Sequence, residues 1–102
     1  MDKKLVLQAK KHDKEAFVKL VENYQVSMYK TAIAILQNDE DAADAIQETI
    51  LICWEKIGSL RNAKFFKTWM TRILIHRCYA IYNENKRTVT ADNFPDVMDC
   101  SD

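Results

Sequence analysis

Two groups of polar side chains in this sequence have the types and the spacing to bind charged partners. The first lies in Asp39 to Ile57, DEDAADAIQETILICWEKI, where Asp44, Gln47 and Glu48 are three and four residues apart. Residues at this spacing are neighbours on one face of a helix. Their oxygen atoms accept hydrogen bonds, so the patch suits a basic partner. A solvated helix surface is the alternative on composition alone.

The second group follows later in the chain, at steps of four, three, four and three residues. It comprises Arg72, His76, Tyr79, Asn83 and Lys86, with Lys67, Arg77 and Arg87 nearby. Cationic, aromatic and amide side chains in one stripe suit the phosphates and the base faces of a nucleic acid. A basic solvated surface is the alternative here.

The sequence offers no motif for catalysis or for metal binding. It has no glycine-rich phosphate loop, no H-E-x-x-H, and no carboxylate and histidine pattern of a di-iron bundle. The DEDAAD run lacks the central glycine and the terminal glutamate of an EF-hand. Cys53, Cys78 and Cys100 show no metal-ligand spacing, which predicts free thiols in a reducing compartment. We therefore expect a protein that is not an enzyme and needs no metal or cofactor.

The charges lie in blocks, although 15 basic and 15 acidic residues give a formal net charge of zero. Residues 1–38 carry seven basic and four acidic groups, 39–60 one and six, 61–87 seven and one, and 88–102 none and four. Such blocks suit a protein with two different partners. The length of 102 residues and the hydrophobic content of 48% suit one small domain. Without a signal-peptide core or a bilayer-length apolar run, we expect a cytoplasmic protein without membrane insertion.

Helical periodicity predicts an all-α fold, a compact bundle of three main helices and a short N-terminal helix. The short helix lies within residues 1–12, and Asp13 caps a long helix from Lys14 to about Leu36. The acidic helix follows a tight connection, with Asn38 or Asp39 as its cap and Gly58 as its stop, so the two helices should be antiparallel. A loop over 58–64 precedes the last helix, which runs from about 65 to 85.

The residues expected in the core recur at steps of three and four. In the first two helices they are Leu5, Val6, Ala9, Phe17, Leu20, Val21, Tyr24, Met28, Ala32, Ile35 and Leu36. In the acidic helix they are Ala43, Ile46, Ile50, Cys53, Trp54 and Ile57, and in the last helix Phe66, Trp69, Met70, Ile73, Ala80 and Ile81.

Two segments resemble one protein family, in the same order along the chain. Asp41, Asp44, Gln47 and Glu48, followed by Trp54, resemble the D-x-x-D-x-x-Q-E segment of sigma factors of bacterial RNA polymerase. The run FKTWMTRI over 66–73 resembles the F-x-T-W-L-x-R-I segment of the same domain. The resemblance covers roughly residues 13–87 and points to region 2 of the small extracytoplasmic-function branch.

This resemblance implies a promoter-specificity factor for transcription initiation, with core RNA polymerase and promoter DNA as partners. The helix with the first motif would grip the coiled-coil clamp of the largest polymerase subunit. The loop and the last helix would recognise and help to melt the −10 element on the non-template strand. An anti-sigma factor is a further expected partner, and no small-molecule substrate is expected.

The site residues follow from the resemblance and from the two groups above. Polymerase binding is assigned to Asp41, Asp44, Gln47, Glu48 and Leu51. DNA binding is assigned to Ser59, Arg61, Asn62 and Lys64 in the loop, where the family holds a flipped base, and to Lys67, Arg72, His76, Arg77, Tyr79, Asn83, Lys86 and Arg87. Trp69 matches the first of two adjacent tryptophans used in strand opening, but the second is Met70 here, so we favour Trp69 in the core.

The domain prediction is a region 2 domain over 1–87 and an acidic linker over 88–102, broken by Pro95. Nothing in the chain resembles the second domain that reads the −35 element. Two other functions remain open: a helical adaptor that binds only protein, and a metal-dependent helical enzyme. Salt-dependent binding to a −10 oligonucleotide would exclude the adaptor, and stoichiometric metal would favour the enzyme.

Overall fold

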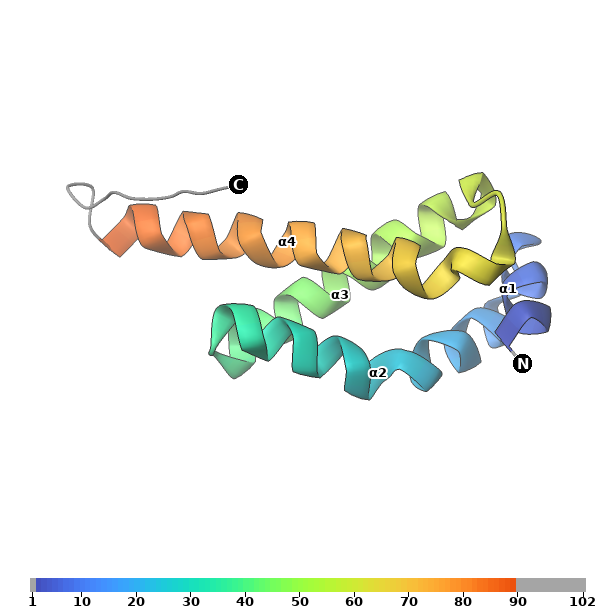
Figure 1. Cartoon of the computed structure of the whole chain (residues 1–102), viewed down its shortest axis with the longest axis horizontal. Helices are drawn as coiled ribbons and strands as arrows, with labels where there is room; N and C mark the ends of the chain where they lie inside the picture. The colour runs from blue at the N-terminus through green and yellow to red at the C-terminus, as the bar shows by residue number, and fades with distance from the viewer. Residues whose placement is uncertain (1, 90–102) are drawn as a thin grey trace.

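The computed structural model describes residues 2–89 and, for side chains, residues up to 86. Figure 1 shows the helices α1 (Asp2–Lys10), α2 (Lys14–Leu36), α3 (Asp39–Lys56) and α4 (Phe66–Val89). Two single 3-10 turns, η1 (Ile57–Ser59) and η2 (Ala63–Phe65), join α3 to α4. The predicted all-α fold of three main helices and a short N-terminal helix is confirmed.

The three long helices run alternately up and down, so that α3 is antiparallel to α2 and to α4 (Figure 1). Each of the three contacts the other two, and α1 packs across the end of the bundle against α2, η1 and η2. The C-terminal end of α4 extends past the turn between α2 and α3 (Figure 1). None of the helices in the described range is long and apolar enough to cross a bilayer.

Side chains and backbone at the helix ends explain why α2 and α3 begin and end where they do. The Asp13 carboxylate accepts a hydrogen bond from the Ala16 amide at 3.2 Å and caps α2, as predicted. Gln37 then adopts a left-handed conformation (φ 55°), and its amide bonds to the Ile33 carbonyl at 2.8 Å. Of the two predicted caps of α3, Asn38 accepts from the Asp41 amide at 2.9 Å.

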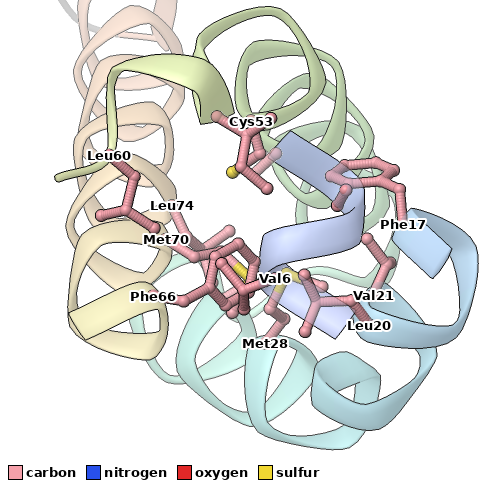
Figure 2. Close-up of a cluster of buried hydrophobic side chains, with 14 of the residues drawn as sticks. Val6, Phe17, Leu20, Val21, Met28, Cys53, Leu60, Phe66, Met70 and Leu74 are labelled. Atoms are coloured by element: carbon pink, nitrogen blue, oxygen red, sulfur yellow. The ribbon is translucent and has the colours of Figure 1, made fainter. Parts of the chain in front are cut away.

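The core contains buried side chains from all four helices (Figure 2). The predictions for the first two helices are confirmed. Val6, Ala9, Phe17, Leu20, Val21, Met28 and Ala32 are buried, and Leu5, Tyr24, Ile35 and Leu36 are partly buried against the core. Each large apolar side chain that is fully buried stabilises the bundle by about 1.5–3 kcal/mol relative to an exposed one.

The prediction for the buried face of α3 is confirmed for Cys53 and Ile57, which are buried, and is wrong for Ala43. Ala43 is exposed, and the fully buried residues before Ile57 are Ala42, Ala45, Thr49 and Cys53. Ile46, Ile50 and Trp54 are only partly buried. Because α3 packs against both α2 and α4, its two small alanines face the neighbours. The polar Thr49 fits this face because its hydroxyl donates to the Ala45 carbonyl at 2.7 Å.

The prediction for α4 needs three corrections. The helix spans Phe66–Val89 rather than about 65–85. Leu74 and Cys78 are buried although they were not predicted, whereas Ala80 is exposed. Beyond Ile81, every side chain up to Lys86 is exposed, and the C-terminal end of α4 extends past the α2–α3 turn (Figure 1). Trp69 is partly buried and packs on Phe66, with ring centroids 5.9 Å apart, in agreement with the predicted core position.

The predicted loop over 58–64 is shorter and more ordered than expected, since both of its ends form 3-10 turns. Gly58 lies within η1, so α3 ends at Lys56 before the predicted stop. Leu60 is buried in the core, and its carbonyl accepts a 2.6 Å hydrogen bond from Lys10 Nζ of α1. The linker prediction lies outside the described residues from position 90 onward, as does Cys100.

Candidate functional site

Four of the five residues predicted to bind polymerase lie around one shallow hollow on α3. Asp44, Gln47, Glu48 and Leu51 line it together with Ile50, which was not predicted as a site residue. Leu51 is 60% exposed, so the hollow combines an apolar wall with carboxylate and amide oxygens. We call Asp41, Asp44, Gln47, Glu48 and Leu51 the acidic surface.

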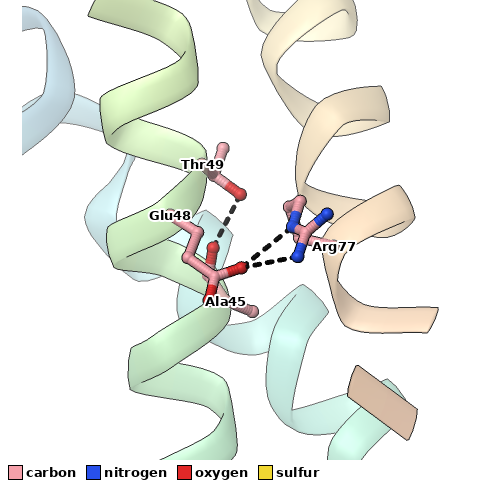
Figure 3. Close-up of polar contacts among 4 residues, drawn as sticks. All are labelled: Ala45, Glu48, Thr49 and Arg77. Atoms are coloured by element: carbon pink, nitrogen blue, oxygen red, sulfur yellow. Dashed lines mark hydrogen bonds and ion pairs between the residues drawn. The ribbon is translucent and has the colours of Figure 1, made fainter. Parts of the chain in front are cut away.

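Two carboxylates of the acidic surface are held by side chains of α4. Glu48 Oε1 accepts from both Nε and Nη2 of Arg77, each at 2.9 Å (Figure 3). Asp41 Oδ2 accepts from Asn85 Nδ2 at 2.7 Å. Among the described residues, Asp44 and Gln47 have no such partner. The acidic surface therefore contains two side chains that are free to bind and two that are already engaged.

The second predicted surface runs along α4. Arg72, His76, Tyr79, Asn83 and Lys86 are all exposed, and so is Lys67, which lies five residues before Arg72. We call these six residues the basic stripe. Arg77 differs from them, because it is only partly exposed and paired with Glu48. The side chain of Arg87 lies outside the described range.

The four predicted loop residues, Ser59, Arg61, Asn62 and Lys64, are all exposed next to the start of α4. Two of them use part of their hydrogen-bonding capacity within the loop. The Ser59 hydroxyl donates to the Lys56 carbonyl at 2.7 Å, and the Asn62 side-chain oxygen accepts from the Lys64 amide at 2.9 Å. The Asn62 amide nitrogen and the Ser59 lone pairs are left for a ligand.

Three further residues belong to these surfaces but were missed from the sequence. Phe65 is 54% exposed beside the loop, while Phe66 next to it is buried. Tyr82 lies edge to face with Tyr79, with centroids 6.5 Å apart, and Lys86 Nζ lies 5.6 Å from its ring centre. Asn85 holds Asp41. Tyr82 could have been found from its spacing of three residues after Tyr79.

The cysteines in the described range do not form a reactive site. Cys53 and Cys78 are free thiols that are fully buried in the core. Desolvation raises the pKa of Cys53 to about 12 and raises that of Cys78 as well. Because the thiolate is the nucleophile and the metal ligand, both thiols are inert in the folded protein. The part of the chain that the structure describes also has no group of three or more metal-binding side chains.

Comparison with known proteins identifies the family. Residues 20–88 match the model of the family Sigma-70 region 2. The chain belongs to this sigma family. The region 2 domain is 34% identical over 73 residues to the ECF RNA polymerase sigma factor SigW of Bacillus subtilis, an alignment that covers 72% of the chain and 39% of SigW. It is 31% identical over 75 residues to the RNA polymerase sigma-H factor of Pseudomonas aeruginosa, covering 74% of the chain and 39% of that relative.

A solved structure agrees with this assignment. The region 2 domain superposes on the NMR structure of an engineered region 2 of sigmaE in complex with GTAAAA, with a TM-score of 0.79 and 25% identity. The match covers 87% of this chain and 93% of the other. The predicted resemblance to the extracytoplasmic-function branch is confirmed. The chain spans about two fifths of the length of the two curated relatives, 39% of each.

Proposed function

We propose that this region 2 domain is a promoter-specificity factor that binds core RNA polymerase and the −10 element of promoter DNA. The observation that carries the proposal is the presence of two exposed surfaces of opposite charge on adjacent helices. The acidic surface contains the first family motif, and the basic stripe includes Arg72 of the second. The role is a binding role in the cytoplasm, and the polymerase supplies the catalysis.

The acidic surface is the proposed contact for the coiled-coil clamp of the largest polymerase subunit. Asp44 and Gln47 are exposed and unpartnered within the described range, so they can accept hydrogen bonds from a basic partner without losing an internal one. Leu51 adds exposed apolar area beside them. An anti-sigma factor is a second proposed partner, by resemblance alone.

The loop and the basic stripe are the proposed contact for the non-template strand of the −10 element. The cations of the basic stripe suit phosphates, and Tyr79 offers an aromatic ring for stacking. The amide nitrogen of Asn62 suits the edge of an unpaired base. The neighbour's complex with GTAAAA supports this proposal, because that protein has the same fold.

The DNA arm of the test uses fluorescence anisotropy with labelled GTAAAA and its single-base variants over a range of salt concentrations. Arg72→Ala should weaken binding to every oligonucleotide and lower the salt slope by about 0.7, the value for one phosphate contact to a single strand. Asn62→Ala should change the base preference and leave the slope unchanged. Lys19→Ala, which removes an exposed cation of α2, is the control and should change neither.

The polymerase arm measures binding to a clamp coiled-coil fragment. Asp44→Lys should abolish binding, while Glu55→Lys, the same change at an exposed position of α3 outside the acidic surface, should reduce it little. Both variants should keep the wild-type melting temperature within a few degrees, because exposed charges contribute little to stability. Fragment binding without salt-dependent oligonucleotide binding would support the protein adaptor instead. Binding of neither probe would contradict the proposal as a whole.

A further inference from the structure

The ion pair between Glu48 and Arg77 joins the acidic surface to α4, the helix that carries the basic stripe. Glu48 belongs to the acidic surface, and Arg77 was assigned to DNA from the sequence. Both contacting nitrogens of Arg77 bind the same oxygen, Oε1, so Oε2 of Glu48 and Nη1 of Arg77 are outside the pair. Each residue can therefore begin to bind an external partner before the pair separates.

We propose that this pair couples the two sites, so that a basic partner bound at Glu48 releases Arg77 for a DNA phosphate. This inference rests on the proposed function, since it requires both partners. In the free domain, the Glu48 carboxylate neutralises Arg77 and weakens its attraction for DNA. Once cations of the partner neutralise Glu48, its carboxylate no longer competes with a DNA phosphate for Arg77. Linkage requires the reverse effect as well, so DNA bound at Arg77 should favour the partner at Glu48 by the same factor.

The partial exposure of both side chains makes this exchange feasible. The side chains of Arg77 and Glu48 are 37% and 46% exposed, so water and salt weaken their attraction and a partner can replace it. The backbone on both sides need not move. Thr49, next to Glu48, is buried and bonded to the Ala45 carbonyl (Figure 3), and Cys78, next to Arg77, is buried in the core. The exchange needs only side-chain rotation.

The second bridge between the helices should not carry the same coupling. Asn85 is neutral, so release of its amide from Asp41 frees no cation for a phosphate. Coupling to DNA is therefore expected at Glu48 and not at Asp41. Ion pairs as exposed as that of Glu48 with Arg77 contribute a free energy that corresponds to a change of about 2- to 5-fold in affinity.

The first experiment measures binding of labelled GTAAAA to the full chain across salt concentrations. Glu48→Gln should tighten binding about 2- to 5-fold more than Asp44→Asn does, because only the first variant releases a cation. Its salt slope should also rise, by up to about 0.7. Asp44→Asn is the matched control, because it removes the same charge one helical turn away, from a carboxylate that has no partner in the described structure. In an Arg77→Gln background, Glu48→Gln and Asp44→Asn should act alike.

The second experiment measures binding of the clamp coiled-coil fragment without DNA. Arg77→Gln should tighten binding more than Arg72→Gln, because Arg77 competes for Glu48 whereas Arg72 is an exposed cation of the same helix without a partner in the described range. If the wild type binds both probes but Glu48→Gln matches Asp44→Asn, or Arg77→Gln matches Arg72→Gln, the coupling is overturned and the proposed function stands. If the wild type binds neither probe, both are overturned.

Discussion

At the scale of single residues, the burial of Cys53 links the stability of the bundle to pH. Desolvation raises the pKa of its thiol from the ordinary value of 9.0 to about 12. The folded protein therefore keeps a proton that the unfolded chain loses above pH 9. This contribution to stability is complete below about pH 9 and is lost as the pH rises toward 12. Cys78, whose pKa is also raised, acts in the same direction.

Chemical denaturation at a series of pH values tests this prediction. Above pH 9, the free energy of unfolding should fall by up to about 1.4 kcal/mol per pH unit for each buried thiol. Cys53→Ala should lower stability at every pH but flatten this decline. Leu74→Val is the control, because it also disturbs the core but removes no titrating group. Equal slopes for the wild type and Cys53→Ala would contradict the assignment to Cys53.

The contacts of single site residues could be predicted only in part from the sequence. The exposure of Asp44, Gln47 and Arg72 followed from their polar character and helical spacing. The pairing of Glu48 with Arg77 did not, because the two residues are 29 positions apart and meet only through the relative rotation of two helices. For the same reason, no local pattern indicated that Asn85 would hold Asp41.

At the scale of elements, α1 depends on the rest of the bundle. A helix of nine residues is too short to be stable alone in water. Val6 and Ala9 anchor it in the core, Lys10 bonds to the Leu60 carbonyl, and Asp2 accepts hydrogen bonds from Asn23 and Tyr24 of α2. We infer that α1 also supports the turns between α3 and α4, since Lys10 binds the backbone there.

Adjacent residues of α1 provide a matched test of this role. Val6→Ala should cost about 1–3 kcal/mol of unfolding free energy, because Val6 is fully buried. Leu7→Ala removes a larger side chain that is 46% exposed and should cost less unfolding free energy than Val6→Ala. Urea denaturation measures both values. Similar losses for the two variants would show that α1 does not pack as described.

The existence and order of the helices were more predictable than the face that each one buries. Caps such as Asp13 and Asn38 are local signals, so the starts of α2 and α3 could be predicted. In α3, apolar residues occupy two overlapping stripes, and the polar Thr49 interrupts the one that is buried. The sequence therefore favoured Ala43 over Ala42, and only the presence of helices on two sides of α3 decides between them.

At the scale of the whole molecule, α4 has two regions: one that packs in the core and one whose side chains are all exposed. The part of α4 from Phe66 to Cys78 packs against α2 and α3, and Phe66, Met70, Leu74 and Cys78 are buried there. Residues 82–86 bury no side chain, although Asn85 still bonds to Asp41 at the start of α3, and the C-terminal end of α4 extends past the α2–α3 turn. The prediction that Ala80 is buried was wrong, because helical periodicity alone does not show where the neighbouring helices end.

This extension of α4 has a consequence for the time scale on which the protein opens. A helical segment that buries no side chain frays with a small free-energy cost, even where an exposed hydrogen bond such as that of Asn85 to Asp41 holds it, whereas packed turns open only with the core. In hydrogen–deuterium exchange, the amides of 82–86 should therefore exchange well before those of 70–78. Bound DNA should slow exchange at 82–86, because contacts to Asn83 and Lys86 would disfavour the open state. The end of the helix would then complete its ordering only on the promoter, and part of the binding free energy would be used to order it.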